Sequence, residues 1–258
     1  MPINIVDSEA EKYVVNIGAS VGEPYDPSYQ YITDPSYRGL CIEGDINKIE
    51  GLRKNVSSKM EIHNGYVTPY NVISLFEQYK VPKNLFILKI DIDGYDLEVL
   101  RTILKSEYRP TVFVAEINEK IPPPIRFEVL YKSDYKWDCS HCFGFSIQSG
   151  KDVFESSDYF IATMYEMNNI LCIRKDKIHL LPEESFPKDI EDMYDKQYRH
   201  NRGMRKKTFP WNSNVNHWLT IEDRDNLKNT ITNYFTKIND RSKFKNKLKI
   251  ENKDFMIY

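Results

Sequence analysis

Residues 85–100, LFILKIDIDGYDLEVL, contain the pattern that decides the fold. Leu85–Ile90 is a short, strongly apolar run, which is typical of a strand buried on both faces of a parallel sheet. The run leads into Asp91-Ile-Asp-Gly, and apolar residues then recur at helical spacing from Leu97 to Leu104. A buried strand followed by a turn and an amphipathic helix predicts one unit of a parallel α/β sheet.

Similar units lie on both sides of this stretch. The other predicted strands are Tyr13–Ile17, Gly39–Glu43, Met60–Val67, Thr111–Ile117, Tyr159–Tyr165 and Ile170–Arg174, and the other predicted helices are Asp45–Asn55 and Val72–Gln78. Met167-Asn168-Asn169 reads as the turn of an antiparallel hairpin. We therefore predict an α/β fold with a doubly wound, mostly parallel seven-stranded sheet and an antiparallel edge hairpin.

The composition is that of an ordinary globular protein. The 258 residues carry a formal net charge of -2, with 41% hydrophobic and 29% charged residues. Neither a disordered chain nor a generic nucleic-acid binder is therefore expected. No apolar run is long enough to span a membrane and residues 1–8 lack the layout of a signal peptide, so we expect a cytoplasmic protein. The four cysteines are scattered, which favours reduced thiols over a disulfide framework.

The charge changes sign along the chain. Residues 1–173 have a net charge of -8, and residues 174–258 have a net charge of +6. We predict two parts, a ligand-binding domain over residues 1–175 and a helical, basic C-terminal appendage over residues 176–258. The Lys- and Asn-rich stretch 237–254 reads as a solvated helix or a frayed terminus.

Small residues follow the first predicted strand, in Asn16-Ile-Gly18-Ala-Ser20-Val-Gly22. Glycines let the backbone approach a ligand closely, and a helix after them could offer free N–H groups. Glu43 ends the second predicted strand about twenty residues later, where a carboxylate suits the two hydroxyls of a ribose. A surface glutamate at a strand end is the alternative. The pyrophosphate fingerprint G-x-G-x-x-G is missing, so an adenosine-type ligand without phosphates fits better.

Five stretches, taken in order, resemble class I S-adenosylmethionine-dependent methyltransferases, most closely the FkbM-type and related sugar O-methyltransferases. They are VVNIGASVGEPYDPSY, GLCIEGD, MEIHNGYVTP, LFILKIDIDGYDLEVL and TVFVAEINEKIPPP, within residues 12–175. The most specific element is LKIDIDGYDLEVL, in which a hydrophobic strand precedes two acids, a glycine and a helix. The chain departs from the family pattern at Asp93 and Asp96, where glutamate is more usual, and at Asn16, where aspartate is frequent.

The resemblance implies a Rossmann-like methyltransferase fold and assigns roles to the residues that follow the predicted strands. The implied cofactor-binding residues, running from the methionine through the ribose to the adenine of S-adenosyl-L-methionine, are Asn16, Gly18, Ser20, Gly22, Glu43, Asn64, Gly65 and Tyr66. The implied residues of the reaction centre are Asp91 and Asp93, faced by Glu116 and Asn118.

Some relatives bind a divalent cation with such acids. Oxygen ligands from neighbouring strand ends suit Mg²⁺ or Mn²⁺, which would orient an acceptor hydroxyl and lower its pKa. We predict Asp91, Glu116 and Asn118 as the metal ligands. The alternative is structural: Asp91 would cap the following helix, and Asp93 and Asp96 would interact with its N-terminal dipole.

The predicted catalytic residues are Asp91, Asp93 and His141, with the general base the least determined role. His141 lies in Cys139-Ser-His141-Cys142, although a lone histidine is more often a packed or surface residue. The same C-x-x-C invites a zinc interpretation, which lacks a second pair of ligands.

We therefore predict an S-adenosylmethionine-dependent O-methyltransferase. Its acceptor would be a carbohydrate or a nucleotide-activated small molecule, in surface (capsular) polysaccharide biosynthesis, a substrate class that rests on analogy. The alternative is a non-catalytic module that binds adenosine or a nucleotide. A nicotinamide-dependent oxidoreductase is disfavoured by the missing third glycine of the dinucleotide fingerprint.

The basic tail suggests a further role. Arg199–Arg205, Trp211 and Trp218 could cover the acceptor pocket, because aromatic faces suit sugar rings and basic side chains suit phosphate. The alternative is an appendage for packing or for formation of a homo-oligomer. Nucleic acid is not among the expected partners.

Overall fold

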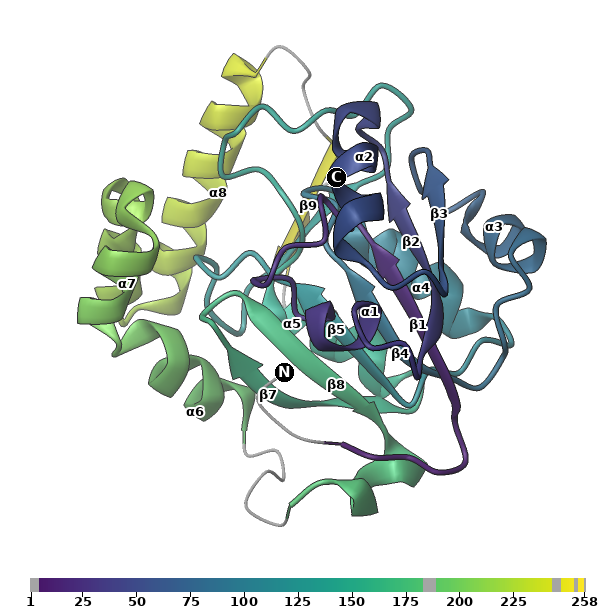
Figure 1. Cartoon of the computed structure of the whole chain (residues 1–258). Helices are drawn as coiled ribbons and strands as arrows, with labels where there is room; N and C mark the ends of the chain where they lie inside the picture. The colour runs from purple at the N-terminus through teal and green to yellow at the C-terminus, as the bar shows by residue number, and fades with distance from the viewer. Residues whose placement is uncertain (1–4, 183–188, 243–246, 253–254, 258) are drawn as a thin grey trace.

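The main sheet has the predicted α/β architecture. The structure is a computed structural model that describes residues 5–182, 189–242, 247–252 and 255–257 (Figure 1). Within them, seven strands pair in the order β3-β2-β1-β4-β5-β8-β7. Their bounds are β1 (Glu11–Ile17), β2 (Arg38–Glu43), β3 (Met60–Asn64), β4 (Leu85–Ile90), β5 (Val112–Glu116), β7 (Tyr159–Tyr165) and β8 (Asn169–Arg174). Only β8 runs opposite to the other six strands of this sheet, so the predicted Rossmann-like sheet with an antiparallel edge hairpin is confirmed.

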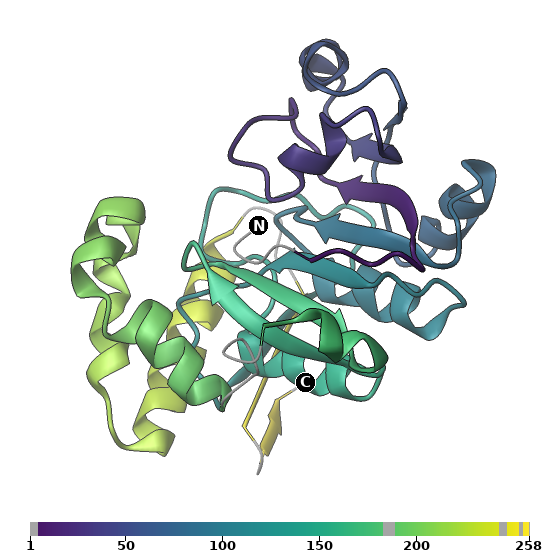
Figure 2. The same cartoon turned by 60° about the horizontal axis from the view of Figure 1, so that its bottom comes forward.

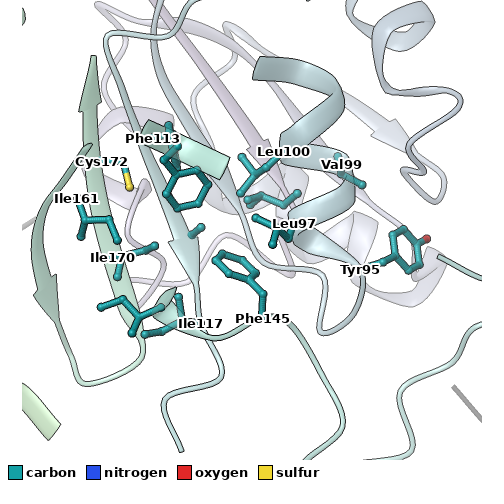
Figure 3. Close-up of a cluster of buried hydrophobic side chains, with 14 of the residues drawn as sticks. Tyr95, Leu97, Val99, Leu100, Phe113, Ile117, Phe145, Ile161, Ile170 and Cys172 are labelled. Atoms are coloured by element: carbon teal, nitrogen blue, oxygen red, sulfur yellow. The ribbon is translucent and has the colours of Figure 1, made fainter. Parts of the chain in front are cut away.

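Helices cover both faces of this sheet. They are α1 (Tyr29–Ile32), α2 (Ile46–Asn55), α3 (Val72–Gln78), α4 (Asp96–Lys105) and α5 (Ile147–Glu155). Successive strand residues point to opposite faces, and Val14 and Val15 of β1 accordingly belong to two different buried clusters. Figure 3 shows the larger cluster, in which Leu97 and Leu100 of α4 lie near Phe113 of β5.

The first crossover differs from the expectation. The glycine turn after β1 was expected to lead into a helix, but residues 21–28 form a loop, and α1 is only four residues long. Pro24 and Pro27 explain the difference, because the residue before a proline avoids the helical conformation. The backbone N–H groups that follow the glycine turn therefore belong to a loop and not to the N-terminus of a helix.

The tail contains helices and a second sheet. Its elements are η1 (Lys175–Leu180), α6 (Ile190–Tyr194), η3 (Asp195–Arg199), α7 (Arg202–Thr208), η4 (Pro210–Asn214), η5 (Asn216–Thr220), α8 (Arg224–Arg241), β9 (Lys247–Asn252) and β10 (Phe255–Ile257). β9 pairs antiparallel with β10 and with β6 (Arg126–Leu130), a strand that the sequence analysis did not identify. The interpretation of 237–254 as a solvated helix or a frayed end is therefore wrong for 247–252. Leu248 and Ile250 alternate with lysines there, which is the period of a strand.

The tail packs on the sheet domain. Figures 1 and 2 show α6, α7 and α8 gathered at one side of the molecule. Trp218 of η5 and Phe235 of α8 belong to the same buried cluster as the main sheet. The rings of Phe235 and Phe127 of β6 lie 4.6 Å apart. The division of the chain at residue 175 stays a prediction, and the two parts share one hydrophobic core.

Among the described residues, every helix is too short or too polar to traverse a lipid bilayer.

Candidate functional site

A cavity of about 430 Å³ lies at the carboxyl ends of β1 and β4. Four segments line it: the turn and loop after β1, the end of β4, the β7–β8 turn, and the chain around the end of α7. Ligands of open α/β sheets bind at this edge, and the volume falls within the range of roughly 300–1,000 Å³ that is usual for small-molecule sites. The cavity is therefore the candidate functional site.

The glycine turn forms one wall of the cavity. Gly18 has a φ of +77°, and a Cβ atom there would lie 1.8 Å from the carbonyl oxygen of Asp91. The N–H groups of Gly18 and Ala19 both donate to the carbonyl oxygen of Ile42, at 2.9 and 3.0 Å. Only glycine fits at position 18, because the turn is wedged between β2 and β4.

Glu43 fixes this turn from the end of β2. It is 8% exposed, and its carboxylate accepts hydrogen bonds from the N–H groups of Ser20, at 2.7 Å, and Asp45, at 2.8 Å. Each oxygen retains a second lone pair that a hydroxyl could use. Glu43 is not among the residues that line the cavity, so a ligand that reaches it extends past Ser20, which does line the cavity.

Residues 64–66 lie beside Glu43, as the resemblance implied. The side-chain amide of Asn64 donates to the carbonyl oxygens of Glu43, at 2.9 Å, and Gly44, at 3.3 Å. Gly65 donates from its N–H group to the carbonyl oxygen of Glu43, at 3.0 Å. Tyr66 is 75% exposed, and its ring lies so close to Gly44 that a Cβ atom there would be 2.6 Å away. These residues offer an open, aromatic surface next to the ribose position.

Asn16 is fully buried below the turn. Its amide nitrogen donates to a carboxylate oxygen of Asp26 and to the hydroxyl of Ser28, both at 2.9 Å. Its amide oxygen has no hydrogen-bond partner among the described residues. Asp26 itself lines the cavity, whereas Asn16 does not. The carboxylate expected to bind the ammonium group of the cofactor's methionine portion therefore comes from Asp26 in the loop and not from residue 16 in β1.

Lys89 of β4 is a functional residue that the sequence analysis missed. It is 2% exposed and lines the cavity. Its Nζ donates to the carbonyl oxygen of Gly18, at 2.8 Å, and lies 3.5 Å from carboxylate oxygens of both Asp26 and Asp91. Burial would lower the pKa of Lys89, but Asp91 and Asp26 raise it above its ordinary value. A single cation inside the apolar run LFILKI is the pattern that could have revealed it.

Three carboxylates meet beside Lys89. One oxygen each from Asp91, Asp93 and Glu116 lies within 4.8 Å of the others. Burial and the charge of Asp91 raise the pKa of Asp93 to about 6, and the same two causes raise the pKa of Glu116 well above its ordinary value. Glu116 also accepts a hydrogen bond from the side-chain amide of Asn168, at 2.6 Å. Such a group shares protons or attracts a cation.

The donor set suits a hard divalent cation. Three carboxylates are ligands that Mg²⁺ and Mn²⁺ prefer, although Asp91 would be shared with the ammonium of Lys89. Among the described residues, this is the one group of His, Cys, Asp or Glu side chains close enough to share an ion. The amide nitrogen of Asn118 donates to the carbonyl oxygens of His141 and Phe143, both at 2.9 Å, and its amide oxygen has no hydrogen-bond partner among the described residues, so Asn118 as a metal ligand stays a prediction. Asp93 is the third acid of this group.

The structural alternative for the acids applies to Asp96. Its carboxylate accepts hydrogen bonds from the N–H groups of Ile92, at 2.8 Å, and Gly94, at 2.9 Å. It thereby orders the turn that carries Asp93, which has a positive φ of 53°. The hydroxyl of Tyr135 donates to the carbonyl oxygen of Asp93 at 2.5 Å and holds the same turn from the opposite side.

His141 lies away from this cluster. Its ring packs 6.1 Å from that of Tyr234 in α8, and it is not among the residues that line the cavity. Burial and the nearby Lys120 lower the pKa of His141 to about 4, so the ring is neutral at pH 7. The catalytic role of His141 stays a prediction.

The tail reaches the cavity through Thr208 and Phe209. Trp211 is 61% exposed, and its ring lies 5.6 Å from that of Phe209. Trp218, in contrast, is fully buried and donates from its indole N–H to the carbonyl oxygen of Lys120 at 2.7 Å. Arg205 is also buried, and its guanidinium donates to the carbonyl oxygen of Tyr198 at 2.5 Å. Trp218 and Arg205 therefore brace the tail.

Comparisons with known proteins give similarity to solved structures only. No protein-family model and no curated protein matches the chain. The O-methyltransferase TomG of Streptomyces achromogenes, involved in tomaymycin synthesis and solved in complex with S-adenosylmethionine, is 17% identical with a TM-score of 0.40, over 63% of this chain and 73% of that one. CalS10 of Micromonospora echinaspora, an amino pentose methyltransferase solved with S-adenosylmethionine, is 8% identical with a TM-score of 0.38, over 64% of this chain and 84% of that one. An S-adenosylmethionine-dependent methyltransferase of Aquifex aeolicus is 9% identical with a TM-score of 0.38, over 63% and 81%. The roles of individual residues are therefore argued from geometry.

Proposed function

We propose that this protein is an S-adenosylmethionine-dependent O-methyltransferase that acts on a small hydroxylated acceptor. The observation that carries the proposal is one cavity that joins the close-approach turn at Gly18 to the carboxylate of Asp91. Glu43 extends the same edge of the sheet toward the surface and is tied to the turn through Ser20. The turn at Gly18 and one member of the acid cluster, Asp91, thus face a common space, and Asp93 and Glu116 lie next to Asp91.

The residues present fit the cofactor in its separate parts. Asp26, held by Asn16 and Lys89, offers a carboxylate for the ammonium of the methionine portion. Glu43 offers two carboxylate oxygens for the ribose hydroxyls, and Tyr66 offers an exposed ring for the adenine. When bound, S-adenosylmethionine supplies an activated methyl group on a sulfonium.

The acids would remove the proton from the acceptor hydroxyl. Methyl transfer requires an aligned acceptor oxygen, the exclusion of water and the removal of one proton. Asp93, whose pKa burial and Asp91 raise to about 6, is ionised at pH 7 and is a stronger base than an ordinary aspartate. Glu116 and Asp91 would hold Mg²⁺ or Mn²⁺ together with Asp93, and such an ion would lower the pKa of the hydroxyl.

The wall of the cavity that the β7–β8 turn and the end of α7 form is consistent with a carbohydrate acceptor. Asn168, Asn169, Thr208 and Phe209 line it. Amides and hydroxyls pair with sugar hydroxyls, and aromatic faces cover the apolar side of a sugar ring. A role in surface polysaccharide biosynthesis, a cytoplasmic location and a homo-oligomer belong to the same proposal.

Calorimetric titration with S-adenosylhomocysteine tests the cofactor site. Glu43→Ala removes a charge-assisted contact to the ribose, so affinity should fall by about 10- to 150-fold, which corresponds to about 1.5–3 kcal/mol. Glu50→Ala in α2 is the matched control, because Glu50 is an exposed carboxylate outside the cavity. Failure of the wild-type protein to bind, or equal affinity of the Glu43 variant, contradicts the proposal.

A further inference from the structure

The cavity has an unbalanced charge. Its lining includes the carboxylates of Glu23, Asp26, Asp91 and Glu166. Among the described residues of that lining, Lys89 is the only cation. Its Nζ is already engaged by the carbonyl oxygen of Gly18 and by two carboxylates. Apart from a metal ion at the acid cluster, a phosphate in the cavity would therefore meet several carboxylates and no available cationic side chain.

The acids fall into two groups. Asp26 and Asp91 surround Lys89 in the interior of the cavity. Glu23 and Glu166 are exposed at its rim, and in the described part of the chain neither carboxylate has a hydrogen bond or an ion pair. The two rim carboxylates are therefore free to bind a ligand from solution.

The turn that presents Glu166 has an unfavourable backbone. Glu166 has a φ of 49° and Met167 a φ of 71°, and neither residue is the glycine or asparagine that such a turn favours. Strain of this kind is retained where the surrounding structure needs the geometry, and functional sites are frequent examples. Here the turn also delivers Asn168, whose amide donates to Glu116 of the acid cluster. Glu166 is thus connected through one short hairpin loop to the reaction centre.

An aromatic ring lines the same cavity as Glu166. Phe209 is partly exposed, and its ring makes an edge contact with Trp211. A carboxylate and the face of an aromatic ring together favour an organic ammonium group. The basic residues Arg202, Lys206 and Lys207 of α7 are exposed but do not line the cavity, so they do not change its charge.

We propose that the acceptor is a hydroxylated small molecule that carries a protonated amine. Its ammonium group would bind Glu166 and Phe209, while its reacting hydroxyl would face Asp91 and Asp93. This inference rests on the proposed methyltransferase function and narrows its substrate class. It also disfavours the nucleotide-activated acceptor suggested by the basic tail, because a phosphate beside Glu166 and Phe209 would meet a carboxylate and no cationic side chain of the lining.

The test compares three charge forms of one scaffold. Transfer of a labelled methyl group is measured to each of several aminohexoses, to the N-acetyl form and to the phosphate ester of the hexose. For at least one scaffold we expect kcat/KM for the amine to exceed that of the other two forms by about ten-fold or more, and Glu166→Gln to lower it by about five- to ten-fold. Glu77→Gln, an exposed carboxylate of α3 outside the cavity, should change nothing.

Each outcome has a distinct meaning. A phosphate ester or N-acetyl form that is the better substrate overturns the inference, as does absence of transfer to every amine in protein that binds S-adenosylhomocysteine. Unchanged kcat/KM in the Glu166 variant removes that residue from the acceptor site. If the protein fails to bind S-adenosylhomocysteine, the proposed function fails instead. The same probes are then titrated without cofactor, and preferential binding of the amine that Glu166→Gln weakens supports the charge argument independently.

Discussion

Replacement of Lys89 by methionine should destabilise the protein strongly, because it leaves a buried carboxylate without its cation. Lys89 Nζ lies 3.5 Å from oxygens of Asp26 and Asp91, and at an effective dielectric constant of about 20 each pair attracts by about 5 kcal/mol before desolvation is subtracted. Asp91 is 34% exposed, so water screens that pair, whereas Asp26 is 8% exposed. Loss of one partner of a buried pair costs about 3–5 kcal/mol, a large part of the 5–15 kcal/mol that stabilises a typical domain.

The size of this effect should depend on pH. Burial raises the pKa of Asp26, but Lys89 and the hydrogen bonds from Ser28 and Asn16 outweigh it and hold the pKa below its ordinary value. A lowered folded-state pKa adds stability above the unfolded-state pKa of about 3.9, and that stability is lost as the pH falls through the folded value. In Lys89→Met the carboxylate is buried without a cation and protonates more readily. The loss of stability should therefore be greatest near pH 7 and should shrink toward about pH 4.

Urea unfolding at several pH values measures this loss. Lys54→Met, which removes an exposed lysine from an i,i+4 pair with Glu50, is the matched control and should behave as an ordinary surface substitution. The double variant Lys89→Met/Asp26→Asn should recover part of the stability, because it removes both charges. A loss below about 1 kcal/mol at pH 7, or a loss that does not change with pH, would refute the assigned role of Lys89.

Four further predictions concern the turn, the acids and the tail. Gly18→Ala should cost more than about 3 kcal/mol in chemical unfolding, because its Cβ would overlap the Asp91 carbonyl; a stability near wild type contradicts the turn geometry. Asp93→Asn and Glu116→Gln should retain cofactor affinity but lose about 10²-fold in turnover, and wild-type turnover in both would remove these two acids from the reaction. Because burial and Asp91 raise the pKa of Asp93 to about 6, Mn²⁺ affinity measured by electron paramagnetic resonance should increase from pH 5 to pH 7, and a constant affinity argues against a metal at this cluster. Trp218→Phe should destabilise the protein by removing a buried indole hydrogen bond, whereas Trp211→Phe should not; equal effects in thermal unfolding would contradict the bracing role.

The apolar pattern of the sequence was enough to predict the sheet and the edge of the sheet at which the candidate site lies. A short apolar run such as Leu85–Ile90 is typical of a strand buried on both faces of a parallel sheet, and β4 has these bounds in the structure. The residues that follow such strands must gather at one edge, so Gly18, Glu43 and Asp91 could be expected near one another. Each of these inferences uses a local pattern and one general rule of topology.

Which of the polar side chains at this edge contact one another depends on the folded chain. Asn118 is as close to Glu116 in sequence as Asp93 is to Asp91, yet its amide nitrogen binds the loop at His141, and its amide oxygen has no hydrogen-bond partner among the described residues. Side-chain direction depends on the path of the chain beyond the strand end, which a spacing rule does not contain. Lys89 and Glu166 illustrate the same limit, because Lys89 meets Asp26 from 63 residues away and Glu166 belongs to the lining of a cavity built from separate segments. Coulomb interactions and cavities depend on distances in space, and only the folded chain sets those distances.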